Sequence, residues 1–141
     1  MKIQLLALVI AVTIGLSGYA QCDKKSIISS SKTEHLDANG EVQRSVDELS
    51  LIEFDKKEII INAGDSPEMR GTIDSVTCDW KVPFKEGKTV LKVSLVDPNG
   101  QQISLTITIE GKDGKISFLA VMGDTQDRKI RITVDTFEEK K

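Results

Sequence analysis

Few side chains of this sequence could perform acid–base, nucleophilic or metal chemistry. Its 141 residues include one histidine and two cysteines. A serine or cysteine hydrolase needs a base beside its nucleophile, usually histidine, but His35 follows the polar residues 32–34 and is expected to be exposed. Structural zinc needs four cysteine or histidine ligands, and neither a calcium-loop pattern nor a glycine-rich phosphate motif is present. We therefore expect a non-enzymatic protein that uses no metal and no cofactor.

The charge of the chain also excludes a class of partner. The formal net charge is −3, whereas affinity for nucleic acid is built largely from Lys and Arg side chains that neutralise backbone phosphates. We expect no nucleic-acid partner.

The two cysteines, Cys22 and Cys78, allow one intramolecular disulfide. In an oxidising compartment an even number of cysteines favours such a bond, so we predict a Cys22–Cys78 disulfide. The alternatives are a buried Cys78 with an unpaired Cys22, or a redox or intermolecular role. No Cys-x-x-Cys motif supports a redox role, and an enzyme that uses the thiol of Cys78 would need that cysteine to be free.

The aromatic residues of the segment 80–88 make it the best candidate for contact with a ligand or a protein partner. Trp80 and Phe84 lie within five residues of each other, and tryptophan is favoured at interaction hot spots. We predict this segment to be the longest loop, with Trp80, Lys81, Phe84 and Lys85 as candidate contact residues. The alternative is that the two rings plug one end of a barrel as ordinary core.

Residues 1–20 have the pattern of a secretory signal peptide. Lys2 precedes an apolar run over 5–16, and Ala20 ends a group of small residues at the expected cleavage site. The run is shorter than the roughly 20 residues needed to cross a membrane, so we expect no transmembrane span. The prediction is an exported protein, periplasmic or extracellular. A membrane-anchored lipoprotein acylated at Cys22 is the alternative, although residues 19–21 depart from the lipoprotein pattern.

The apolar residues of 21–141 recur at every second position, which is typical of β-strands. The alternation is clearest over 103–110, 129–135 and 91–95, and residues 116–122 are apolar on both faces, as in a strand covered on both sides. Further strands are expected in the segments 26–35, 42–46, 48–54, 57–62 and 69–79. Short turns at 97–100, 111–114 and 123–127 separate neighbouring strands, and links of this length connect antiparallel strands.

These segments predict one all-β domain over residues 21–141, an antiparallel meander of eight or nine strands. Closure into a barrel would remove the exposed edge strands that otherwise invite pairing with another chain. A two-sheet β-sandwich is the alternative architecture.

Three segments carry a resemblance to known proteins. The sequence LIEFDKKEIII over 51–61, TCDWKVPFKEGKT over 77–89 and DRKIR over 127–131 resemble small exported bacterial proteins with a lipocalin-like (calycin) β-barrel. The resemblance implies a lipocalin-like barrel fold.

Together these observations predict an exported β-barrel that binds a small apolar ligand or a protein partner. The alternative is a solid-cored secreted interaction or inhibitor module that acts through the 80–88 loop. The two differ in the barrel interior, which a solid core would fill with Ile103, Leu105, Ile107, Ile116 and Phe118.

Overall fold

The computed structural model describes residues 21–141 except 98 and 124–127. The predicted signal peptide, residue 98 of the predicted 97–100 turn and residues 124–127 of the predicted 123–127 turn lie outside the described part.

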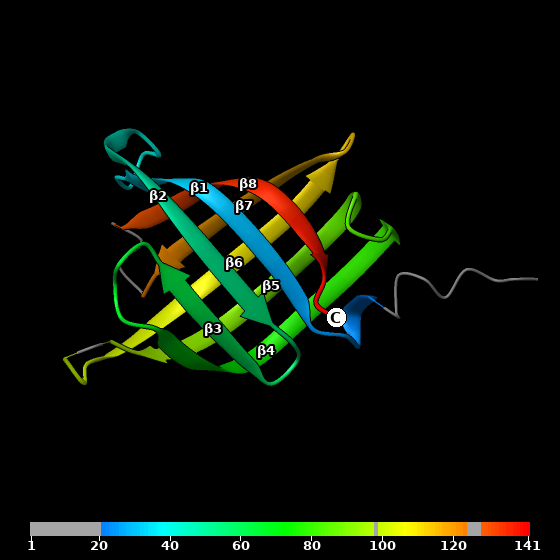
Figure 1. Cartoon of the computed structure of the whole chain (residues 1–141), viewed down its shortest axis with the longest axis horizontal. Coiled ribbons are helices and arrows are strands. Elements are labelled where there is room, and N and C mark those ends of the chain that lie inside the picture. Colours follow the sequence, from blue (N-terminus) through cyan, green and yellow to red (C-terminus); the bar gives the residue numbers. More distant parts are fainter. Residues whose placement is uncertain (1–20, 98, 124–127) are drawn as a thin grey trace, which may run out of the picture.

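The described chain forms eight antiparallel strands that close into one barrel in sequence order, with β8 paired back onto β1 (Figure 1). This confirms the all-β meander and the barrel over the two-sheet sandwich. The strands are β1 (Ser26–Leu36), β2 (Val42–Phe54), β3 (Glu58–Ala63), β4 (Met69–Val82), β5 (Glu86–Val96), β6 (Gln102–Lys112), β7 (Lys115–Met122) and β8 (Lys129–Glu139).

Alternate side chains face the barrel interior, as the period-two pattern predicts. Leu91, Val93 and Leu95 on β5 are buried, and so are Leu105 and Ile107 on the neighbouring β6. Residues 116–122, expected to be covered on both sides, instead alternate between buried and half-buried or exposed positions along β7. Only the inner face of this strand is fully covered, because a single-walled barrel leaves its outer face to solvent.

Two strand boundaries differ from the sequence-based expectation. The expected separate strands 42–46 and 48–54 are one continuous strand, β2, because β1 pairs along its whole length. The expected loop 80–88 is wrong: β4 continues to Val82 and β5 begins at Glu86, with Cys78 paired to Thr89. The connection is a turn in which the Lys85 N–H donates to the Val82 carbonyl at 3.0 Å.

An aspartate closes the turn between β2 and β3. The Asp55 carboxylate accepts hydrogen bonds from the backbone N–H groups of Lys57 at 2.7 Å and Glu58 at 2.9 Å. Burial raises the pKa of Asp55, but these two hydrogen bonds and the nearby charges of Lys25 and Lys57 outweigh it, so the pKa lies below its ordinary value of 3.8. The charged carboxylate therefore stabilises the fold.

Replacing Asp55 by Asn keeps an acceptor oxygen and removes the charge, so Asp55→Asn should lower the free energy of unfolding by about 1 kcal/mol at pH 7. Because the native pKa is depressed, this stabilisation is present above the ordinary value of 3.8, which the unfolded chain has, and is lost as the pH falls through the native pKa. Urea unfolding at pH 7 and near pH 2.5 measures the effect. The same difference between wild type and variant at both pH values would contradict the prediction.

A candidate ligand-binding cavity

The two ends of the barrel differ. One end carries residues 21–25 and the turns at 55–57 and 83–85, and we call it the closed end. The other carries the turn at 37–41 and the residues 97 and 99–101, and we call it the open end. In Figure 1 the closed end lies at the right, beside the chain terminus marked C, and the open end at the left.

Four aromatic side chains fill the closed end, and we call them the aromatic plug: Phe54, Trp80, Phe84 and Phe137. The ring of Phe137 lies at their centre, with its centroid 4.8 Å from that of Phe84, 5.5 Å from that of Trp80 and 6.4 Å from that of Phe54. Trp80 is 4% exposed, and its indole N–H donates to the Thr89 hydroxyl at 2.7 Å. The plug is thus a packed cluster with its buried indole nitrogen satisfied.

The backbone is shaped to admit the plug. A Cβ atom on Gly111 would clash with the Lys85 carbonyl oxygen and lie 2.8 Å from the Trp80 ring. One on Gly87 would clash with the Asp79 carbonyl oxygen and lie 2.7 Å from the same ring, so only glycine fits at both positions. Phe84 has φ of 61°, in the left-handed region that costs a non-glycine residue roughly 1–2 kcal/mol. It follows Pro83 in a turn of the type that requires positive φ at this position, and its contact with Phe137 offsets the strain.

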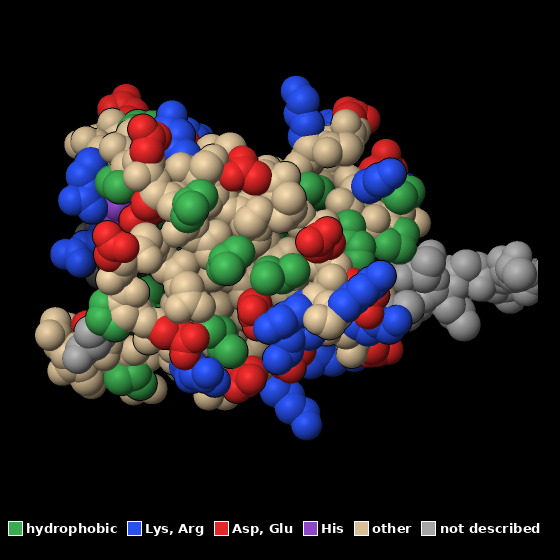
Figure 2. Space-filling model, viewed as in Figure 1, with side chains coloured by type: hydrophobic (Ala, Val, Ile, Leu, Met, Phe, Trp, Pro, Cys, Tyr) green, Lys and Arg blue, Asp and Glu red, His purple; other side chains and the backbone are tan. Residues whose placement is uncertain are grey.

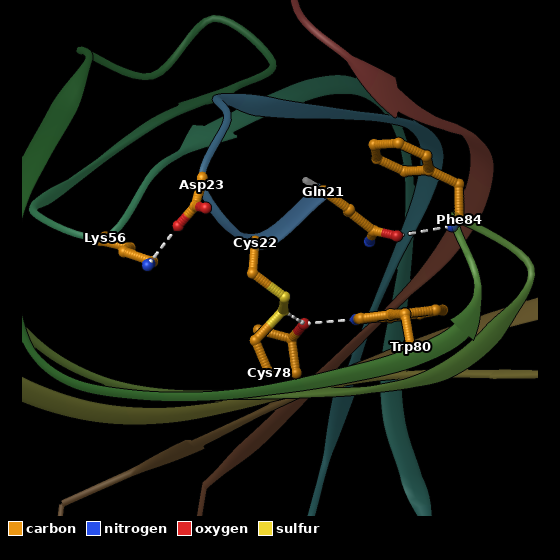
Figure 3. The surroundings of a disulfide bond; sticks show 8 residues. Gln21, Cys22, Asp23, Lys56, Cys78, Trp80 and Phe84 are labelled. Atoms are coloured by element: carbon orange, nitrogen blue, oxygen red, sulfur yellow. Dashed lines mark hydrogen bonds and ion pairs between the residues drawn. A yellow bond between two sulfur atoms is a disulfide. The ribbon is translucent and has the colours of Figure 1, made fainter. Parts of the chain in front are cut away.

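The segment that precedes β1 is fastened across the closed end (Figure 3). Cys22 forms a disulfide with Cys78 of β4, with Cα atoms 6.0 Å apart, as the sequence predicts. The side-chain oxygen of Gln21 accepts a hydrogen bond from the Phe84 N–H at 2.8 Å, and Asp23 forms an ion pair with Lys56. Three successive residues are therefore each bonded to a different part of the barrel base.

The structure separates the four candidate contact residues of the 80–88 segment. The rings of Trp80 and Phe84 enter the plug, whereas Lys81 and Lys85 are exposed. None of the four lines the cavity described next. The geometry fits the alternative stated above, in which the rings plug one end of the barrel.

A cavity of about 460 Å³ occupies the barrel between the plug and the open end. Exposed Arg44 and Ser66 mark its opening. Most of its wall is apolar, contributed mainly by β5 to β8. These apolar residues are Val46, Ile52, Ile61, Ala63, Met69, Leu95, Ile103, Leu105, Ile107, Phe118, Ala120, Met122, Ile130 and Ile132.

Four of the five residues expected to fill a solid core line this cavity. Ile103, Leu105, Ile107 and Phe118 form part of its wall, whereas Ile116 packs at the edge of the core and does not reach it. Ile107 and Phe118 are 0% and 3% exposed, so the wall is closely packed around them.

One side of the cavity is polar, where β1 and β2 face the interior. Its members are Thr33, His35, Arg44, Glu48 and Ser50, and we call them the polar wall. The Arg44 guanidinium lies 3.1 Å from Nε2 of His35. His35, expected to be exposed, is half-buried at the cavity opening because a bulge in β1 shifts the inward face of the strand.

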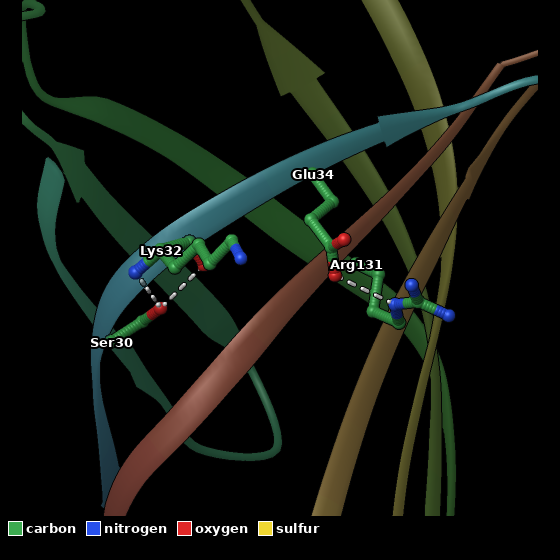
Figure 4. Close-up of polar contacts among 4 residues, drawn as sticks. All are labelled: Ser30, Lys32, Glu34 and Arg131. Atoms are coloured by element: carbon green, nitrogen blue, oxygen red, sulfur yellow. Dashed lines mark hydrogen bonds and ion pairs between the residues drawn. The ribbon is translucent and has the colours of Figure 1, made fainter. Parts of the chain in front are cut away.

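That bulge is held by a serine (Figure 4). The Ser30 hydroxyl donates to the Lys32 carbonyl at 3.0 Å and accepts from the Lys32 N–H at 3.3 Å, where the register of β1 slips against both neighbours. Glu34 projects outward and pairs with Arg131 of β8 at 3.0 Å. The hydrogen bond from Arg131 holds the pKa of Glu34 below its ordinary value, against a smaller opposing effect of desolvation.

Sequence reasoning missed the polar wall, and Ser50 is its most buried member. It is 4% exposed, lines the cavity, and its hydroxyl has no hydrogen-bond partner among the described residues. The available signal was its position, since Ser50 has the same parity as the inward-facing Ile52 and Phe54 of β2.

The outer surface carries further hollows of about 540–620 Å³, but these are more open to solvent than the cavity inside the barrel. Phe84 and Lys85 line one of them, and Lys81 lines another. On the face shown in Figure 2, acidic and basic side chains are interspersed over the barrel wall. Within the described ranges, no group of three or more His, Cys, Asp and Glu side chains could hold a metal ion. Nor does any helix of that part have the length and apolar character to cross a membrane. Comparison with protein-family models, with curated proteins and with solved structures finds no match for this chain.

Proposed function

We propose that this protein is a non-enzymatic binding protein that holds a small, mainly apolar molecule inside its barrel. The observation that carries the proposal is the 460 Å³ cavity with its continuous apolar wall. Ligand pockets are typically about 300–1,000 Å³, mainly apolar, with a few polar groups that orient the ligand. An apolar space of this size is unfavourable for water, which finds few hydrogen-bond partners there.

The arrangement of the two ends supports the same function. The aromatic plug and the disulfide close the base, so a molecule entering at the open end would be enclosed on all other sides. The disulfide also favours a protein that functions in an oxidising compartment, outside the cytosol. An interaction module acting through residues 80–88 would have to rely on the exposed Lys81 and Lys85, because the rings of Trp80 and Phe84 are engaged in the plug.

The fluorescent hydrocarbon diphenylhexatriene tests the proposal, because it has no hydrogen-bonding group and measures apolar binding alone. We expect saturable binding near one molecule per chain. Ala120 lines the cavity, so Ala120→Phe should place a ring in it and weaken binding at least about tenfold, since lost contacts of this size are worth about 1.5–3 kcal/mol.

Leu119→Phe is the matched control. Leu119 is the sequence neighbour of Ala120, and its side chain does not line the cavity, so the affinity should stay within about twofold of wild type. Circular dichroism and thermal unfolding establish that both variants are folded, and Met122→Trp, nearer the opening, replaces Ala120→Phe if the latter is not. Absence of binding to the wild type, or equal affinity in a folded cavity-filling variant, would overturn the proposal.

A further inference from the structure

The hydroxyl of Ser50 is an anomaly in an otherwise satisfied interior. It is the one buried side-chain polar atom of the described residues that lacks a hydrogen bond. Leaving such a group unpaired costs about 1–3 kcal/mol, and unpaired groups of this kind are rare in folded proteins. The Ser50 oxygen is itself fully buried, although its residue lines the cavity. A hydroxyl can both donate and accept, and rotation about the Cα–Cβ bond gives it three staggered positions, so this rotation would bring it to a molecule bound in the cavity.

The partner strand offers an internal comparison. Ser30 faces Ser50 across the β1–β2 ladder and is 1% exposed. Its hydroxyl is fully used by Lys32, and Ser30 does not line the cavity. The two serines lie at one level of the barrel but differ in their hydrogen bonds. The Ser30 hydroxyl holds a bulge, whereas the Ser50 hydroxyl has no partner among the described residues and its residue lines the cavity.

The charges near Ser50 define what could bond to it. Glu48 lies two residues away on the same face of β2, about 7 Å along the strand, and it makes no ion pair with another described residue. Arg44 lies six residues away, about 20 Å along the strand, where it contacts His35. A carboxylate at Ser50 would be desolvated next to a negative charge and far from the nearest cation of the wall, which is strongly unfavourable.

From these observations we propose that the molecule held in the cavity is uncharged and carries a hydroxyl or carbonyl group that hydrogen-bonds to Ser50. This rests on the proposed function and narrows it to a class of ligand. The hydrocarbon part of the molecule lies against the apolar wall of β5 to β8, and its polar group faces β2. Ser50 is the residue that determines this specificity.

The test compares three probes on purified protein: diphenylhexatriene, 1-decanol and decanoate. The two ten-carbon probes are measured by displacement of diphenylhexatriene or by calorimetry. Ser50→Ala should weaken 1-decanol binding about fivefold to tenfold, which corresponds to one hydrogen bond, and leave diphenylhexatriene binding within twofold. Without ligand, Ser50→Ala should raise the midpoint of thermal unfolding, because an unpaired buried hydroxyl is removed.

Ser30→Ala is the matched control. It removes a hydroxyl of the same burial at the paired position, so it should lower the unfolding midpoint and leave the affinities for both neutral probes unchanged. Equal effects of Ser50→Ala on 1-decanol and diphenylhexatriene would overturn the inference and leave the proposed function intact. A second result would also overturn the inference: decanoate binding more tightly than 1-decanol, with an affinity that falls in Arg44→Gln but not in Ser50→Ala. The preferred ligand would then be anionic and bound at the cavity opening. Failure of diphenylhexatriene to bind the wild type would overturn the proposed function itself.

Discussion

Removing the Cys22–Cys78 disulfide is expected to lower the free energy of unfolding by about 4 kcal/mol. The bond joins residues 56 positions apart, and closing a loop of that length restricts the unfolded chain by this amount in the chain-entropy description. For a domain of this size the corresponding fall in the thermal midpoint is roughly 15 °C. The release of residues 21–23 from the barrel base would add to the loss.

The measurement is thermal unfolding of the oxidised protein, of the protein with a phosphine reductant, and of the double variant Cys22→Ala/Cys78→Ala. Asp23→Asn serves as a control, because it breaks the exposed ion pair with Lys56 next to the disulfide and should change the free energy of unfolding by less than about 0.5 kcal/mol. A reduced protein that unfolds at the same temperature as the oxidised one would refute the expectation.

Trp80→Ala is expected to cost about 3–5 kcal/mol, the usual range for deleting a large buried aromatic side chain. The plug would lose the ring that contacts Phe137, and the Thr89 hydroxyl would lose the indole N–H that it accepts. Gly87 and Gly111, which lie against the indole, have no side chains that could fill the space left by its removal. Urea unfolding, followed by circular dichroism because the variant lacks its tryptophan, measures the effect.

Lys81→Ala and Lys85→Ala are the controls from the same hairpin. Both lysines are exposed, and their loss should change stability by no more than about 0.5 kcal/mol. If Trp80→Ala proved as mild as these two, the plug would not be the packed cluster described above. The large expected cost also shows that replacing Trp80 and Phe84 together cannot test partner binding, because a loss of capture would follow from a loss of fold.

The strands with a buried inner face and a solvated outer face could be predicted well from the sequence. Residues 103–110 alternate strictly and form most of β6, since burial on one side of a pleated strand selects every second residue. Residues 42–48 of β2 carry few apolar side chains, and their strand depends on pairing with β1 rather than on their own sequence. Strand pairing, which depends on the whole fold, can therefore outweigh the low strand propensity of a segment's own residues.

The candidate site could be predicted only in part. The disulfide follows from a count of two cysteines, whereas a cavity is defined by the distance between opposite walls, which no local pattern records. The sequence predicts the segment 80–88 to be the longest loop between strands, with its aromatic residues among the contact residues. In the structure Gly87 pairs with Trp80 in the ladder, and a Cβ there would clash with the Asp79 carbonyl oxygen, with the Trp80 Cα atom and with the indole.

Closure of the barrel joins β1 to β8, and the hydrogen-bonded pair Ser29 and Thr136 is 107 positions apart in the sequence. The wall therefore cannot be completed until the last strand has formed, and so long a separation places folding in the slow range of milliseconds to seconds. Until β8 pairs with β1, the edges of these two strands are open to pairing with other chains. Successful folding of this protein thus depends on how quickly its two terminal strands meet, and conditions that delay their meeting favour aggregation.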